Sequence, residues 1–125
     1  IPEPIHAGGL RYHGMAPLVS HIYELGLVEA ISIPQTECFE GALQFARSEG
    51  IVPAPEPTHA IAAAVREAMA CKESGEEKVI LTALCGHGHL DLAAYETFLS
   101  GQMVDLDLPD SAIQEAMENV PTIAD

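Results

Sequence analysis

Apolar residues recur along this chain with two different spacings, and the segments that they mark alternate. Helical spacing predicts helices over residues 18–25, 36–48, 57–71, 90–99 and 109–119. Short and nearly continuous apolar runs predict strands over residues 28–33, 51–54 and 78–84. The run 78–84 (K-V-I-L-T-A-L) is apolar enough to be buried on both faces, as in a parallel sheet. The pattern therefore predicts an α/β fold with an open, mostly parallel sheet and flanking helices.

The length of 125 residues suits a single α/β domain with a real core. Residues 102–125 read as an acidic C-terminal tail that carries one short helix. The sequence begins at Ile1 without a methionine and enters a glycine-rich loop, so we expect a fragment or a processed product. We find no apolar run of membrane-spanning length.

Charge and cysteine content narrow the class of partner. Five basic residues against nineteen acidic ones give a net charge of −14, which argues against nucleic acid or an anionic membrane as partner. The three cysteines are an odd number without paired spacing, so a disulfide framework is not expected. A reducing, cytoplasmic location follows from that pattern.

Two loops lie where a parallel sheet binds ligands, beyond the carboxyl ends of predicted strands. The first, residues 54–58, holds Glu56 between two prolines. Because Pro57 disfavours the helical region for the residue before it, we expect Glu56 to be extended and its carboxylate to be oriented toward a ligand. The alternative is an acid at a helix N-terminus that merely favours the helix dipole.

The second loop, residues 85–89, reads C-G-H-G-H and leaves several interpretations open. Cys85, His87 and His89 alternate along an extended segment, which is compatible with a metal site, although a fourth ligand is not evident. A Cys–His nucleophile is a second possibility, and a glycine-hinged loop with solvated histidines is a third. As a nucleotide-binding motif the loop is weak, since it lacks the full glycine spacing.

Three motifs, taken in order, carry a resemblance to a known family. Residues 7–14 read A-G-G-L-R-Y-H-G, residues 49–60 read E-G-I-V-P-A-P-E-P-T-H-A, and residues 84–91 read L-C-G-H-G-H-L-D. Together they resemble the C-terminal part of the tryptophan synthase β chain, in particular its divergent β-like subgroup. The resemblance implies a homodimeric lyase of fold type II that depends on pyridoxal phosphate. Such a lyase forms tryptophan from indole and a serine-derived aminoacrylate.

The resemblance also implies roles for particular residues. Glu56 matches the acid beside the cofactor ring and is the expected catalytic residue. Cys85 and Gly86 match the segment that meets the pyridine nitrogen of the cofactor. The main family has serine where this chain has Cys85, and either side chain can hydrogen-bond a neutral nitrogen, the thiol more weakly.

Arg11 departs from the main family, which has an aspartate at that place. A guanidinium binds an anion through two parallel hydrogen bonds, so O-phosphoserine becomes a candidate substrate beside serine. A salt bridge within the loop is the alternative role for Arg11. The same family loop supplies backbone carbonyls to a monovalent cation, which would involve Leu10, Tyr12 and Gly14.

The lysine that forms the Schiff base and the loop that holds the phosphate both lie upstream in the family. Lys72 and Lys78 fall in a charged turn and at a strand start, not in a cofactor motif. We therefore expect this chain to be inactive alone and to need the N-terminal half of the same enzyme. Two alternatives from other classes are a stand-alone α/β module that binds an anion or metal, and an acidic interaction domain.

Overall fold

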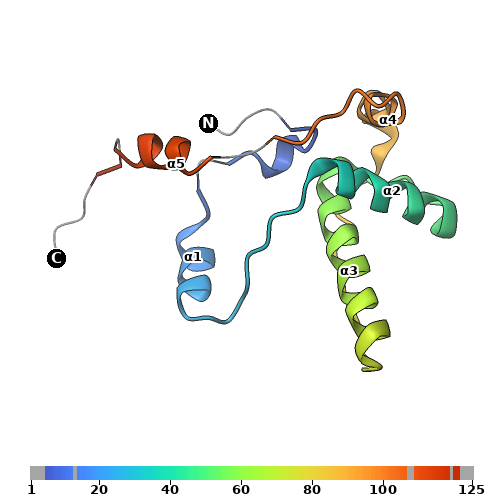
Figure 1. Ribbon diagram of the computed structural model, residues 1–125, viewed down its shortest axis with the longest axis horizontal. Coiled ribbons are helices and arrows are strands. Elements are labelled where there is room, and N and C mark those ends of the chain that lie inside the picture. The colour runs from blue at the N-terminus through green and yellow to red at the C-terminus, as the bar shows by residue number, and fades with distance from the viewer. Residues whose placement is uncertain (1–4, 13, 107–108, 119, 122–125) are drawn as a thin grey trace.

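The computed structural model describes residues 5–12, 14–106, 109–118 and 120–121 (Figure 1). Its α-helices are α1 (Pro17–Glu24), α2 (Gln35–Glu49), α3 (Pro55–Ser74), α4 (Leu92–Leu99) and α5 (Asp110–Met117). Two short 3₁₀ turns, η1 (Gly8–Leu10) and η2 (Gly88–Leu90), precede α1 and α4. Each of the five predicted helices is thus found, with ends shifted by a few residues.

Helices α2 and α3 pack against each other more extensively than any other pair of described elements. Gly41 of α2 faces the backbone of Ala62 on α3, where a Cβ would make an ordinary van der Waals contact at 3.6 Å. An ion pair joins the exposed faces, where Arg66 donates two hydrogen bonds to the Glu37 carboxylate at 2.6 and 2.5 Å. The Arg66 guanidinium holds the pKa of Glu37 below its usual value. Gly50 ends α2 in the left-handed conformation that favours glycine, with φ of 72°.

An aromatic cluster attaches α4 to α2. Phe39 is fully buried and meets the ring of Tyr95 edge-on, with centroids 5.0 Å apart. The Phe98 ring stacks on Phe39 at 5.7 Å. The smaller side chains that complete this core are Ala42, Ala94 and Met103. Aromatic burial of this kind dominates core energetics, so the cluster fixes α4 and the loop before it on α2.

Helix α3 begins earlier than its sequence pattern predicts, and this corrects the expected conformation of Glu56. The helix starts at Pro55, with Ala54 as its N-cap, so Glu56 is helical and not extended. Pro57 does not prevent this, because the first N–H groups of a helix have no intrahelical partner to lose. The restriction that proline places on its predecessor is overcome here by the first helical turn.

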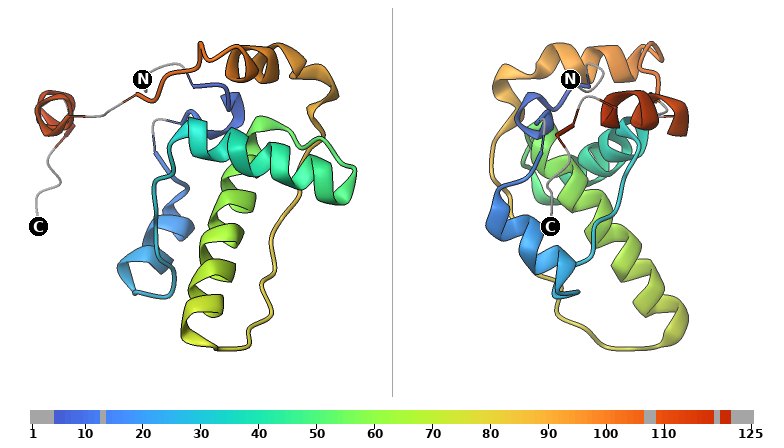
Figure 2. Two further views of the ribbon diagram at one scale, coloured as in Figure 1. Left: turned by 45° about the vertical axis from the view of Figure 1, so that its right-hand side comes forward. Right: turned by 90° about the vertical axis from the view of Figure 1, so that its left-hand side faces the viewer.

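The predicted strands 28–33, 51–54 and 78–84 are not formed among the described residues. The β pairing among the described residues is one antiparallel bridge between Pro53 and His87. Residues 78–84 run back beside α3 as an extended segment (Figure 2). Val79 and Leu81 are 98% and 95% exposed. A strand needs partner strands for its backbone groups and cover for its apolar side chains, and the described residues pair no strand with this segment.

The first residues of the predicted tail pack onto the start of α2. Asp105 accepts hydrogen bonds from the backbone N–H and the hydroxyl of Thr36, at 3.0 and 2.5 Å. The Gln35 side chain donates to the carbonyl of Val104. Asp105 thereby caps α2 from a distant part of the chain. Helix α5 ends at Met117, and the predicted helix end at Asn119 lies outside the described residues.

Helices α1 and α5 lie on the outside, and none of their described residues is buried. Leu18 on α1 is 80% exposed. A search of the described residues finds no helix that is both long and apolar enough to cross a membrane.

Candidate functional site

The two loops singled out by the sequence meet at the start of α3. The Ala54 N–H donates to the Gly86 carbonyl at 3.0 Å, and the Gly88 N–H donates to the Val52 carbonyl at 2.8 Å. These bonds flank the antiparallel bridge between Pro53 and His87. Loop 54–58 and loop 85–89 therefore form one local structure, which we call the paired loops.

The two segments of the paired loops approach each other so closely that glycine is required in loop 85–89. A Cβ on Gly88 would lie 2.4 Å from the Pro53 carbonyl oxygen, a distance at which the backbone would have to shift. A Cβ on Gly86 would lie 3.0 Å from the Cβ of Ala54. The glycines of C-G-H-G-H thus allow contact between two backbone segments, as their residue type suggested.

Glu56 occupies the first turn of α3 and is held by a third segment. The Gly9 N–H, in η1, donates to Oε1 of Glu56 at 2.8 Å. A Cβ on Gly9 would lie 3.1 Å from both Cγ and Oε1 of Glu56, so the loop backbone rests directly on the carboxylate. The hydrogen bond from Gly9 therefore fixes the direction of the Glu56 carboxylate at the N-terminus of α3.

The first turn of α3 is itself rigid. The Thr58 hydroxyl, which is fully buried, donates to the Pro55 carbonyl at 2.5 Å. The His59 ring places Nδ1 3.1 Å from the same oxygen. Two prolines in this turn fix their own φ angles. Glu56 consequently extends from a backbone with little freedom.

Tyr95 connects the aromatic core to the paired loops. Its hydroxyl donates to the Pro53 carbonyl at 2.6 Å. Burial, with a smaller effect of Asp91, raises the pKa of Tyr95 to about 12, so the hydroxyl stays protonated and able to donate. No pattern in the sequence distinguishes this tyrosine from the other residues of its helix.

Cys85 is exposed and differs in this from the buried Cys38. Burial raises the pKa of the Cys38 thiol to about 11, which makes Cys38 a packing residue and not a nucleophile. The rings of His87 and His89 lie 4.8 Å apart, and the His89 N–H donates to Nδ1 of His87 at 3.3 Å. The described residues contain no group of three or more His, Cys, Asp or Glu side chains that could hold a metal ion.

Arg11 lies at the end of η1, two residues after Gly9. Its N–H donates to the Gly8 carbonyl at 3.3 Å, and the residue is partly buried. The contact between Gly9 and Glu56 therefore brings the Arg11 loop to the start of α3 as well. Leu10 and Tyr12 of this loop are 47% and 66% exposed. Gly14 is exposed, and His13 between them lies outside the described residues.

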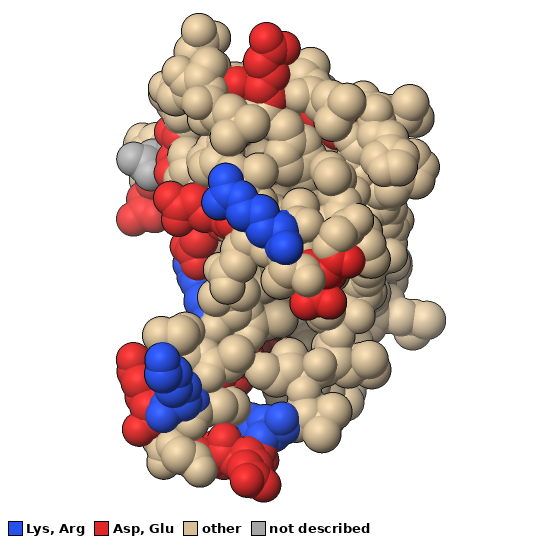
Figure 3. All heavy atoms as spheres, turned by 90° about the vertical axis from the view of Figure 1, so that its right-hand side faces the viewer, with Lys and Arg blue, Asp and Glu red and all other residues tan. Residues whose placement is uncertain are grey.

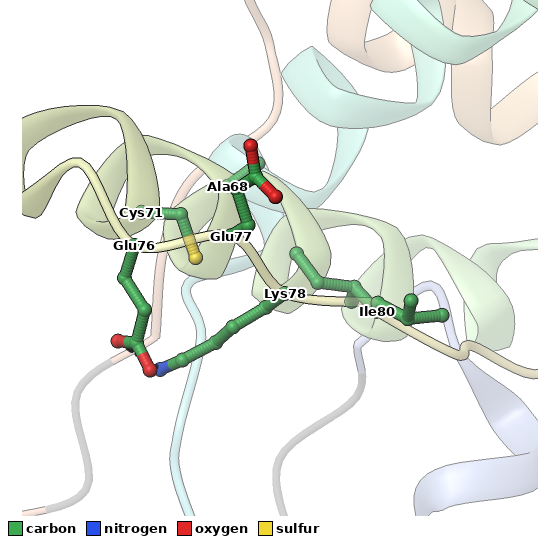
Figure 4. Close-up of a pocket in the computed structure, with 7 residues that line it drawn as sticks. Ala68, Cys71, Glu76, Glu77, Lys78 and Ile80 are labelled. Atoms are coloured by element: carbon green, nitrogen blue, oxygen red, sulfur yellow. Dashed lines mark ion pairs between the residues drawn. The ribbon is translucent and has the colours of Figure 1, made fainter.

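Neither lysine mentioned above lies near Glu56. Lys72 is in the last turn of α3, about 24 Å along the axis from Glu56 at 1.5 Å per residue. Lys78 points to Glu76, with Nζ and Oε2 3.2 Å apart, at the edge of an open groove of about 640 Å³ (Figure 4). This groove lies between the end of α3 and the extended segment, away from the paired loops.

Charged side chains are spread in small groups over the visible face in Figure 3, among many uncharged ones. The basic spheres there lie next to acidic ones, in keeping with five basic and nineteen acidic residues in the whole chain. This face offers no wide basic area of the kind that binds a phosphate backbone.

Comparison with known proteins gives a consistent set of relatives. The chain is 62% identical over 105 residues to "Tryptophan synthase beta chain 2" of Aquifex aeolicus, which is 84% of this chain and 24% of that protein. It is 55% identical over 104 residues to the protein of the same name from Methanosarcina acetivorans, which is 83% of this chain and 24% of the relative. The Thermotoga maritima protein is 59% identical over 95 residues, 76% of this chain and 22% of the relative. No family model matches the chain. The chain thus spans about a quarter of the length of these relatives.

Proposed function

Because the chain belongs to the tryptophan synthase β family, we propose that it forms the cofactor-ring side of a pyridoxal-phosphate-dependent lyase. The full-length enzyme would make tryptophan from indole and serine or O-phosphoserine. The observation that carries this proposal is the identity of 62% over 105 residues, which includes most of the chain. The geometry agrees, since the two loops named by the resemblance are hydrogen-bonded to each other.

The residues at the paired loops fit the edge of a planar, polar ring. Glu56 offers a carboxylate that Gly9 orients, and the exposed Cys85 offers a thiol beside Gly86. A thiol can donate or accept a weak hydrogen bond, which suits a ring nitrogen without a proton. When bound, pyridoxal phosphate supplies the electron withdrawal that allows bonds at the amino acid's α-carbon and β-carbon to break and form.

Within this proposal Glu56 is the catalytic residue of the chain. Its carboxylate, fixed by the Gly9 N–H and by a rigid helical turn, can hold or move a proton at the cofactor's edge. Cys85 and Gly86 would bind the nitrogen side of the ring. Arg11 would bind the anionic group of O-phosphoserine, and Leu10, Tyr12 and Gly14 would offer backbone carbonyls to a monovalent cation.

The remaining parts of the enzyme complete the proposal. An N-terminal half would contribute the Schiff-base lysine, the phosphate loop and the neighbouring strands of an α/β sheet. The extended segment with Val79 and Leu81 would then join that sheet and bury its apolar side chains. We propose a homodimer in the cytoplasm, where the three free cysteines would stay reduced.

The incompleteness of the chain can be tested by its absorbance. Incubated with pyridoxal phosphate, the 125-residue chain should show no lysine-linked absorbance near about 410 nm, whereas the full-length protein should show it. The physical reason is that Lys72 and Lys78 are far from the paired loops. Borohydride trapping followed by peptide mapping locates any attached lysine. Cofactor trapped on Lys72 or Lys78 at stoichiometric yield would overturn the assignment.

A further inference from the structure

We infer that Tyr95 is a positioning residue, whose hydroxyl keeps the Glu56 loop and the Cys85 loop in register. The inference rests on the proposed function, because it concerns how the two loops present their polar groups to the same ligand. Tyr95 itself touches neither Glu56 nor Cys85 through any hydrogen bond described above. It acts through Pro53.

Tyr95 reaches Pro53 from a fixed base. The side chain is buried, and its ring packs edge-on against Phe39 in the core at 5.0 Å. From there the hydroxyl donates to the Pro53 carbonyl at 2.6 Å. Pro53 is itself fully buried. A short hydrogen bond between two buried groups is costly to leave unmade, so it holds Pro53 against α4.

Pro53 is the residue on which both loops depend. It pairs with His87 in the antiparallel bridge, between the two hydrogen bonds that join Ala54 to Gly86 and Gly88 to Val52. Glu56 follows three residues later, in the first turn of α3, and Cys85 directly precedes Gly86. A shift of Pro53 would therefore change the separation between the carboxylate and the thiol.

Helix α4 is connected to both loops, and to loop 85–89 the connection is the chain itself. Its N-cap, Asp91, is the residue directly after η2, and η2 begins at Gly88. The Tyr95 N–H donates to the Asp91 carbonyl at 3.4 Å. Loop 85–89 is thus connected covalently to α4, while loop 54–58 is connected to α4 through the Tyr95 hydroxyl. Removal of the Tyr95 hydroxyl oxygen breaks the connection between loop 54–58 and α4. It keeps the covalent connection of loop 85–89 and leaves the ring packing undisturbed.

The experiment compares Tyr95→Phe with Tyr23→Phe in the full-length protein loaded with pyridoxal phosphate. Tyr23 is 57% exposed on α1, so its variant loses a hydroxyl that supports neither loop. Hydrogen exchange is measured by mass spectrometry for peptides that cover residues 50–56, 84–90 and 58–70. Cofactor content, kcat and KM for serine are measured on the same preparations.

We expect exchange in peptides 50–56 and 84–90 to rise about tenfold in Tyr95→Phe, with less than a twofold change in 58–70. We expect kcat to fall about tenfold, with cofactor content unchanged and KM changed less than twofold. Equal exchange in the two variants would overturn the inference. So would a rise of the same size in all three peptides, which is a global loss of stability, or a local rise without a change in kcat.

The exchange measurement separates this inference from the proposed function. If the wild-type protein makes no tryptophan, the proposed function fails, and the inference about catalytic positioning fails with it. The exchange pattern still decides in that case whether Tyr95 holds the paired loops together. If the wild type is active and Tyr95→Phe matches Tyr23→Phe in every measurement, only the Tyr95 inference is lost.

Discussion

Replacement of Glu56 by alanine in the full-length protein is expected to lower turnover about 10²–10⁴-fold while the cofactor stays bound. The carboxylate is oriented by the Gly9 N–H at 2.8 Å and by the first turn of α3. A positioned acid or base loses this contribution completely when it is truncated. The cofactor should be retained, because the proposal places its phosphate and its lysine in another part of the enzyme. The measurement is kcat together with the absorbance of the bound cofactor.

Two further variants make the Glu56 result specific. Glu56→Gln keeps an oxygen that can accept from Gly9 but removes the charge, so a loss as large as that of alanine would assign the effect to proton chemistry. Glu73→Ala removes an exposed acid from the last turn of the same helix and should leave kcat unchanged. Near-wild-type turnover in Glu56→Ala would reduce Glu56 to an acid that stabilises a helix N-terminus.

Arg11→Ala is expected to weaken the use of O-phosphoserine more than tenfold while serine is affected much less. A guanidinium pairs with a phosphate through two charge-assisted bonds, and the loss of such a contact costs on the order of 1.5–3 kcal/mol. Arg11 lies on the loop that contacts Glu56 through Gly9, which places it beside the proposed ring site. The measurement is kcat/KM for both substrates.

Arg11→Asp should move the preference further toward serine, since a carboxylate repels the phosphate and can accept from the serine hydroxyl. Arg47→Ala, at an exposed position in the last turn of α2, is the matched control for loss of one positive charge. Equal losses on the two substrates in Arg11→Ala would mean that Arg11 only supports its loop. The inference about an anionic leaving group would then be withdrawn.

The helices could be predicted from the sequence because each one carries its own signal. Apolar residues at helical spacing predict both α2 and α3, and Gly50 marks the end of α2, whereas α3 continues to Ser74, three residues beyond its predicted end. The conformation of Glu56 was predicted wrongly. The preference of a residue before proline for extended backbone predicts the wrong conformation, because the helix begins at Pro55 and Glu56 lies in its first turn.

The strands behave differently, because a strand is completed by its neighbours. Residues 78–84 have a strong strand pattern, yet the described residues offer them no partner and leave Leu81 95% exposed. The apolar pattern of a segment shows which environment suits it, but the strands that pair with it must come from other parts of the protein. The sheet therefore remains a prediction for the full-length enzyme.

The loops of the candidate site could be predicted from the sequence, but the distant residues that hold them in place could not. Glycine and proline spacing marked loops 54–58 and 85–89, and the structure joins them by two backbone hydrogen bonds. The contacts of Gly9 with Glu56 and of Tyr95 with Pro53 span 47 and 42 residues. No local pattern reports contacts over such separations. Gly9 could have been suspected from the paired glycines of residues 7–14, whereas Tyr95 looks like any apolar residue of a helix.

We propose that this chain is part of an enzyme that makes tryptophan with pyridoxal phosphate. The most direct test supplies the full-length protein with pyridoxal phosphate, indole and serine labelled with ¹³C at all carbons, and follows the products by mass spectrometry. We predict tryptophan that carries the three labelled carbons of serine, formed only when the cofactor is present, and formed faster from labelled O-phosphoserine. A folded protein that binds the cofactor and releases no labelled tryptophan from either substrate would contradict the claim.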